Sequence, residues 1–116
     1  MPTGAVIERG SNANGEYVKF SDGTMICSIL KTVTDQAINS PYGSLYTGTR
    51  TWTFPAVFVD SPVVTASSAK WGTGSAWAIT DGVSSVASAS LRFFDVVSRS
   101  EGTTFIYSAS AIGRWL

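Results

Sequence analysis

The sequence contains no histidine and only one cysteine among its 116 residues. Without histidine the chain lacks the commonest general base and the commonest ligand of transition metals. A single cysteine cannot form a disulfide within the chain. Cys27 lies in an apolar stretch, so we interpret it as a small core residue rather than a nucleophile. The sequence shows no glycine-rich phosphate loop and no metal-ligand spacing, and we therefore predict no enzyme, no metal and no cofactor.

Charged residues are also scarce. They make up 14% of the chain, and eight basic residues balance eight acidic ones. Binding to nucleic acid through phosphates needs a basic stripe, which the sequence lacks, so we predict no nucleic-acid partner. Small soluble monomers usually keep a more charged surface. We therefore predict that part of the surface is covered in an oligomer.

Long apolar runs are missing as well. No segment approaches the ~20 apolar residues that span a bilayer, so we predict no membrane insertion. No basic start followed by an apolar stretch indicates a signal peptide. We expect synthesis in the cytoplasm.

Serine, threonine, glycine and aromatic residues are abundant, which favours strands and turns over helices. Turn signals separate about six or seven short strand-like stretches, a pattern typical of an antiparallel β-sandwich or barrel. The length suits one domain, which we place at residues 15–116. Residues 1–14 are predicted to be an extended, loosely ordered lead-in from an upstream segment, in which residues 5–9 either add a short strand or contact that segment.

The strongest local signal is a β-hairpin around Asp22-Gly23, a pair that suits a two-residue type I′ turn. With these two residues as the loop, Val18 lies opposite Cys27 and Phe20 opposite Met25. One face of the hairpin is then apolar and predicted to fill the core, through Val18, Phe20, Met25, Cys27 and Ile29. The other face carries Tyr17, Ile26 and Leu30, which we expect to be buried against a neighbouring subunit.

Further along the chain, residues 35–49 are predicted to form a long loop, of the kind that is functional or wraps a neighbour. Trp52 and Phe54 are assigned to the core. A second Asp-Gly pair, at residues 81–82, predicts a turn between strands at 75–80 and 83–94. The last strand is predicted at 103–116. The small residues at 87–90 either allow strands to approach closely around a symmetry axis or fit a tightly packed interior.

Three stretches of the sequence resemble the C-terminal domains of bacteriophage tail fibres. The first is the run of Gly15, Tyr17, Phe20, Asp22-Gly23-Thr24 and Ile26-Cys27, matching G-x-Y-x-x-F-x-D-G-T-x-I-C. The second is residues 52–58 with Pro62-Val63-Val64 soon after, and the third is residues 110–115. The resemblance implies an H-type lectin-like β-sandwich of six or seven antiparallel strands. It also implies assembly as a parallel homotrimer on a fibre shaft in the virion, with sugar bound near the junction between subunits. Sites of that family often include a histidine, which this chain lacks, so its site residues are not transferred.

Carbohydrate binding needs an aromatic surface for the C–H side of a sugar ring and a few polar groups for its hydroxyls. The side chains that supply these groups near predicted loops are Trp71, Trp77, Asp81, Arg92, Tyr42 and Tyr46. The alternative is that the two tryptophans pack in the core or at a subunit interface and that the two tyrosines pack against a neighbouring subunit. Arginines at 50, 92 and 114 either pair with aspartates at 60, 81 and 95 or meet an acidic polysaccharide.

These observations lead to three hypotheses. The first is a trimeric, non-enzymatic tail-fibre tip that binds a bacterial surface polysaccharide, either capsule or lipopolysaccharide. The second is a structural cap that trimerises the fibre, with recognition elsewhere. The third is a polysaccharide depolymerase with a carboxylate pair formed between subunits.

Overall fold

The computed structural model describes residues 5–71, 74–102 and 104–116, with the backbone alone described at 67–71 and 74–76. All regular elements in these residues are β-strands, which confirms the predicted all-β class. The described strands are β1 (Val6–Asn12), β2 (Gly15–Phe20), β3 (Thr24–Val33), β4 (Ser40–Tyr42), β5 (Leu45–Thr53), β6 (Val63–Trp71), β7 (Gly74–Thr80), β8 (Ser88–Asp95) and β9 (Phe105–Arg114). A helix long and apolar enough to cross a membrane does not occur in these residues.

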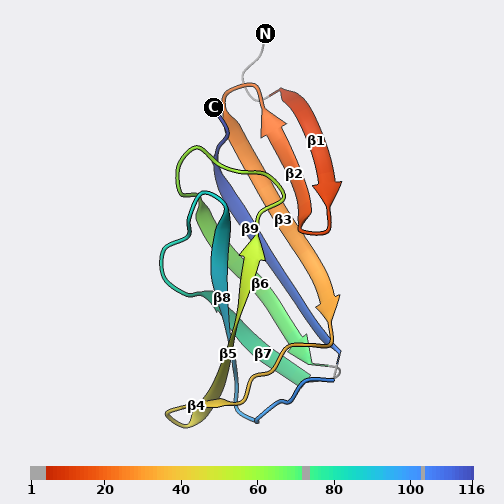
Figure 1. Cartoon of the computed structure of the whole chain (residues 1–116), viewed down its shortest axis with the longest axis vertical. Coiled ribbons are helices and arrows are strands. Elements are labelled where there is room, and N and C mark those ends of the chain that lie inside the picture. The colour runs from red at the N-terminus through yellow and green to blue at the C-terminus, as the bar shows by residue number, and fades with distance from the viewer. Residues whose placement is uncertain (1–4, 72–73, 103) are drawn as a thin grey trace.

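The strands pair in the order β1-β2-β3-β9-β6-β7-β8-β5-β4, and each described pair is antiparallel. The ribbon folds over along β7, whose first residues pair with β6 and whose residues Trp77 to Thr80 pair with β8. The result is a sheet of five strands, β1-β2-β3-β9-β6, packed on a sheet of four, β7-β8-β5-β4. The molecule is elongated, with extents of 52 × 23 × 18 Å. The start of β1 and the end of β9 lie at one end, and β4 lies at the other (Figure 1).

Alternate residues of both sheets fill the core between them, as expected for strands that bury one face. The fully buried apolar side chains include Met25 and Cys27 on β3, Leu91 and Phe93 on β8, and Phe105 on β9. Trp52 and Phe54 are also buried, and their rings meet edge to face at 5.0 Å, which confirms their assignment to the core. The indole N–H of Trp52 donates to the carbonyl of Asn14 at 2.8 Å, so its polar atom is satisfied.

The β2–β3 hairpin forms, but its register differs by one residue from the prediction. Tyr17 lies opposite Cys27, and Val18 lies opposite Ile26. The loop has three residues, because the Gly23 N–H donates to the Phe20 carbonyl at 3.1 Å and Gly23 has φ +93°. A three-residue loop with glycine in the left-handed region is a common alternative to the two-residue turn. The predicted two-residue loop is therefore wrong.

A shift of one residue moves every side chain of β2 to the other face. Met25, Cys27 and Ile29 are buried in the core as predicted. Tyr17, however, packs against the core from β2, whereas Val18 and Phe20 lie half-buried on the opposite face. The prediction that Val18 and Phe20 lie in the core and that Tyr17 lies outside it is therefore wrong. Leu30 is 76% exposed in the single chain, and its burial against a subunit stays a prediction.

Two assignments of strands and loops also need correction. Residues 35–49 are not a long loop, because β4 and β5 form a hairpin there around Gly43. Pro41 obscured this hairpin in the sequence, although proline is tolerated in an edge strand such as β4. The strand predicted from residue 83 begins only at Ser88, since the Ser85 hydroxyl accepts hydrogen bonds from the backbone N–H groups of 87 and 88.

The described residues thus form nine strands rather than six or seven. Part of this difference is β1, which corresponds to the first of the two alternatives given for residues 5–9, a short strand, and extends to Asn12. The last predicted strand is confirmed as β9, with slightly narrower bounds.

Candidate functional site

The outer face of the four-stranded sheet carries most of the predicted ligand residues. Burial alternates along β8, with Leu91 and Phe93 in the core, so Arg92 and Phe94 project to the outer face. The ladder with β7 places Trp77 opposite Phe94 and Ile79 opposite Arg92. Side chains from two neighbouring strands therefore share one surface.

Tyr42 joins this surface from the β4–β5 hairpin. Its ring centroid lies 5.4 Å from that of Phe94, with the rings inclined at 62°. Tyr42 is 58% exposed and Trp77 is 55% exposed, so both present aromatic surface to solvent. We call the set Tyr42, Trp77, Ile79, Asp81, Arg92 and Phe94 the aromatic face.

An ion pair lies at the centre of the polar part of the aromatic face. Arg92 Nη2 donates to Asp81 Oδ2 at 3.2 Å, and Arg92 Nη1 donates to the Thr47 hydroxyl at 3.2 Å. The Thr47 hydroxyl in turn donates to the carbonyl of Phe93 at 3.0 Å. This chain of hydrogen bonds holds the guanidinium in place on the surface of the sheet, so the polar groups of the face are positioned before any ligand arrives.

The chemistry of this arrangement matches a sugar ring. Exposed aromatic rings offer flat apolar surface to the C–H side of a pyranose, while a carboxylate and a guanidinium offer an acceptor and donors for its hydroxyls. All members of the aromatic face except Asp81 stand on paired strands and not on loops, so the geometry is rigid. A rigid surface loses less conformational entropy on binding.

The structure brings together four of the six predicted ligand residues, namely Tyr42, Trp77, Asp81 and Arg92. Tyr46 lies on the other face of β5, as register partner of the buried Asp95, and packs partly against the core. The side chain of Trp71 lies outside the described residues. Sequence reasoning missed Phe94 and Ile79 as members of the face. Alternation along β8 places Phe94 beside Arg92, but the pairing of β8 with β7 is a tertiary contact that no local pattern reveals.

The other predicted arginine–aspartate pairs do not form among the described residues, and Arg50, Arg114 and Asp95 have other partners. Arg50 pairs with Asp35 at 2.9 Å, and Arg99 pairs with Asp95 at 3.1 Å. Arg114 donates to the backbone carbonyl of Asp22 at 2.9 Å. Among the described residues, Arg92 with Asp81 is thus the one ion pair between an arginine and an aspartate that were predicted to pair.

The outer face of the five-stranded sheet has a different character. Val18, Ile26, Ile112 and Val63 are successive register partners across β2, β3, β9 and β6, and we call them the aliphatic row. Ile112 is 52% exposed and Val63 is 75% exposed. The remaining outward positions on β3 and β9 carry only aliphatic or hydroxyl side chains from residue 26 to 32 and from 106 to 112. This surface combines apolar area with an absence of charged side chains at the outward positions of those two stretches.

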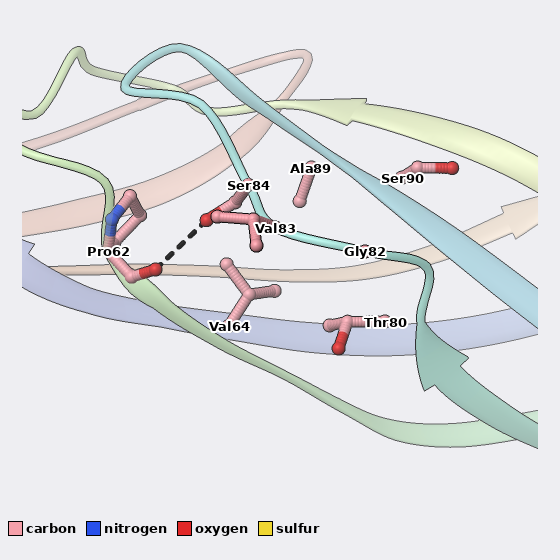
Figure 2. A pocket seen from close by; sticks show the side chains of 8 residues that line it. All are labelled: Pro62, Val64, Thr80, Gly82, Val83, Ser84, Ala89 and Ser90. Atoms are coloured by element: carbon pink, nitrogen blue, oxygen red, sulfur yellow. Dashed lines mark hydrogen bonds between the residues drawn. The ribbon is translucent and has the colours of Figure 1, made fainter.

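A small pocket of about 120 Å³ opens between β6 and the connection that follows β7 (Figure 2). The side chains of Val64, Val83 and Ala89 point toward one another there, and the Ser84 hydroxyl donates to the carbonyl of Pro62 at 2.9 Å. Its lining carries hydroxyls but no charge. The pocket has room for a few water molecules or a small substituent, not for a whole sugar residue.

Cys27 and Glu8 are titratable groups whose pKa values are shifted by their surroundings. Cys27 is fully buried, and burial raises the pKa of its thiol to about 11, which fits its assignment as a core residue. Clusters of three or more metal-ligating side chains are absent from the described part of the chain. Glu8 accepts a hydrogen bond from the Tyr17 hydroxyl at 2.7 Å, which, with the nearby Lys19, lowers the pKa of that carboxyl. These three side chains lie at the β1–β2 edge and serve as a local polar link.

Comparison with known structures finds similar folds in tail fibres of R1-type pyocins. The chain is similar to an N-truncated R1-type pyocin tail fiber, with a TM-score of 0.60, 18% identity, and coverage of 92% of this chain and 86% of that one. It is also similar to a P. aeruginosa R1 pyocin fiber comprising C-terminal residues 323–701, with a TM-score of 0.59 and 19% identity. That match covers 92% of this chain and 28% of the longer fibre. No family model and no curated protein sequence matches the chain. The fold is therefore that of a tail-fibre C-terminal domain, as the sequence motifs predicted.

Proposed function

We propose that the chain is the receptor-binding tip domain of a phage or phage-derived tail fibre, and that it binds a bacterial surface polysaccharide, either capsule or lipopolysaccharide. The fold shared with pyocin tail fibres supports the tail-fibre part of this proposal. The observation that carries the binding part is the aromatic face, where Trp77, Phe94 and Tyr42 surround a fixed Arg92–Asp81 pair. This combination provides the apolar and polar groups that a sugar ring requires.

The tip acts as a homotrimer with an H-type lectin-like sandwich in each subunit, joined to an upstream shaft through its N-terminal segment. The aliphatic row supports this arrangement, because it exposes apolar surface that subunit contacts would remove from water. It lies on a different sheet from the aromatic face, so subunit contact and ligand binding do not compete. Three sites on a repeating polysaccharide would convert weak single-site affinity into avidity.

The domain binds its receptor without cleaving it. Incubation of the assembled protein with host polysaccharide should leave the number of reducing ends unchanged. Released ends would instead favour a depolymerase whose carboxylates meet between subunits.

A purely structural role is the second candidate, and the aliphatic row also supports it. If the domain served only to trimerise the fibre, deleting it from the fibre would abolish shaft trimers and the isolated domain would bind no glycan. Trimers of the shaft that persist after deletion would rule this candidate out.

The binding proposal is tested with the full chain and polysaccharide purified from susceptible bacteria. Trp77→Ala should weaken binding by about tenfold per site, since aromatic contacts are worth about 0.5–1.5 kcal/mol beyond the area they bury. Val57→Ala is the matched control, because Val57 is also exposed, at 63%, but lies in the connection between β5 and β6, outside the aromatic face. Retained binding in Trp77→Ala, or no binding of any host glycan by the parent chain, would overturn the proposal.

A further inference from the structure

The aromatic face has no net charge, because its one positive side chain and its one negative side chain form an ion pair with each other. Its two charged side chains are Arg92 and Asp81, and they neutralise one another at 3.2 Å. The neighbouring outward positions on β5 are threonines at 47, 49, 51 and 53, which pair with Phe94, Arg92, Ser90 and Ser88 of β8. From these observations we infer that the face selects neutral sugars over sugars that bear a carboxylate. This inference rests on the proposed function and specifies its ligand class.

The guanidinium of Arg92 already has hydrogen-bond partners within the chain. One of its terminal nitrogens is bonded to Thr47, and the other is bonded to Asp81. Its side chain is only 26% exposed, so most of it is covered by neighbouring groups on the sheet. A sugar carboxylate could replace Asp81 on the guanidinium only by breaking the existing pair, and the face would gain no net electrostatic attraction from the exchange.

Asp81 is the more accessible partner, with its side chain 40% exposed. Oδ2 is bonded to Arg92, while in the described part of the chain Oδ1 accepts no hydrogen bond. An ionised carboxylate accepts hydrogen bonds and cannot donate them, so Asp81 fits a sugar hydroxyl that donates. A carboxylate on the ligand has no hydrogen to donate and would lie beside a like charge.

The pair therefore suits two adjacent hydroxyls of one neutral pyranose. One hydroxyl donates to Asp81, and its neighbour accepts from a remaining N–H of Arg92, which has five N–H groups in total. The hydroxyl at Thr49, the register partner of Arg92, adds a further neutral polar contact at the same position of the sheet. The rings of Trp77 and Phe94 then take the C–H side of the sugar.

A matched pair of ligands tests this inference on the full chain. An acidic host polysaccharide is assayed before and after chemical reduction of its carboxyl groups, which replaces each carboxylate by a neutral hydroxymethyl group and keeps every linkage. Neutral capsule and neutral O-polysaccharide are assayed separately, which distinguishes the two sources of such sugars. We expect the carboxyl-reduced or neutral form to bind at least tenfold tighter than the carboxylated form, with little dependence on salt.

Asp81→Asn provides the second arm, because it keeps the shape of the side chain and removes its charge. We expect this variant to bind the neutral glycan at least tenfold more weakly than the parent chain does. The ratio of its affinities for the neutral and the carboxylated glycan should also fall, or the carboxylated form should become the preferred one. Asp60→Asn is the control, since Asp60 is an exposed carboxylate outside the aromatic face. Circular dichroism verifies that both variants are folded.

The outcomes separate the inference from the proposed function. Tighter binding of the carboxylated form by the parent chain, or unchanged binding of neutral glycan by Asp81→Asn, would overturn the neutral-sugar inference and leave glycan binding intact. No binding of any glycan in either form would overturn the proposed function itself, and the inference with it.

Discussion

Trp77 lies directly opposite Phe94 in the β7–β8 ladder, and both side chains belong to the outer face of the four-stranded sheet. The position of this pair depends on β7, whose first residues pair with β6 in one sheet while Trp77 and the following residues pair with β8 in the other. The fold-over of the sandwich therefore determines where Trp77 lies. Because both residues stand on paired strands, the aromatic surface is formed in the free protein and its geometry need not change on binding.

If the aliphatic row lies in the subunit interface, a charge introduced into it should prevent assembly of the subunits. Ile112→Asp places a carboxylate in the middle of the row, next to Ile26 and Val63. Burial of this charge in a subunit interface would cost several kcal/mol per subunit, so the proposed trimer should dissociate to monomers. Light scattering of the full chain measures the mass directly.

Val97→Asp is the control for that experiment, because Val97 is similarly exposed, at 51%, but lies outside the row. We expect it to remain trimeric. A parent chain that is monomeric, or an Ile112→Asp variant that keeps the trimeric mass, would contradict the assignment of the row to subunit contacts.

Substitution of Asp95 is expected to cause a large loss of stability. It is 1% exposed, its two carboxylate oxygens accept hydrogen bonds from the Val97 N–H at 3.0 Å and from Arg99 Nε at 3.1 Å, and both bonds are therefore shielded from water. Asp95→Ala removes both acceptors and leaves two donors unsatisfied. We expect a loss of about 3 kcal/mol in the free energy of unfolding, measured by urea denaturation.

Asp35→Ala serves as the comparison for Asp95, because Asp35 also pairs with an arginine, but its side chain is 69% exposed. Exposed pairs contribute little to stability. Equal destabilisation by the two substitutions would show that burial of Asp95 does not determine its contribution.

The buried thiol of Cys27 is expected to resist alkylation in the folded chain and to make stability depend on pH. Burial raises the pKa of the thiol from 9.0 to about 11, with a weaker opposing effect from a backbone hydrogen bond at Ala56. Because the folded pKa lies above the unfolded one, the stability gained from the neutral thiol is present below pH 9 and is lost as pH rises toward 11. Iodoacetamide at pH 8 should modify the folded chain far more slowly than the chain in urea, as measured by mass spectrometry. Rapid alkylation of the folded chain would contradict the buried position.

The sequence predicted the fold class well, because alternation and turn signals are local. The positions buried on β3 and β8 follow from that alternation, and so do Trp52 and Phe54. The β2–β3 register did not follow, since Asp22-Gly23 is compatible with loops of two or three residues. Trp115 and Arg114 help to decide between them. The Trp115 indole N–H donates to the Phe20 carbonyl at 2.8 Å, and Arg114 donates to the Asp22 carbonyl at 2.9 Å.

These contacts also explain why two of the sequence motifs occur together. The Asp-Gly hairpin and the motif near the C-terminus are more than 80 residues apart in sequence but are bonded to each other in the fold. The aromatic face depends on similar long-range pairing. Residue types alone indicated Trp77, Arg92, Asp81 and Tyr42, but only the strand order places them on one surface and moves Tyr46 to the other side.

The most direct measurement is an NMR titration of the ¹⁵N-labelled full chain with fragments of host surface polysaccharide. We predict that the indole N–H signal of Trp77 and the backbone amides of β7 and β8 around it shift on binding. The indole signals of Trp52 and Trp115 should stay in place, because each N–H is bonded to a backbone carbonyl inside the fold. Shifts confined to the aliphatic row, with the Trp77 signal unchanged at saturating ligand, would contradict the aromatic face as the binding site.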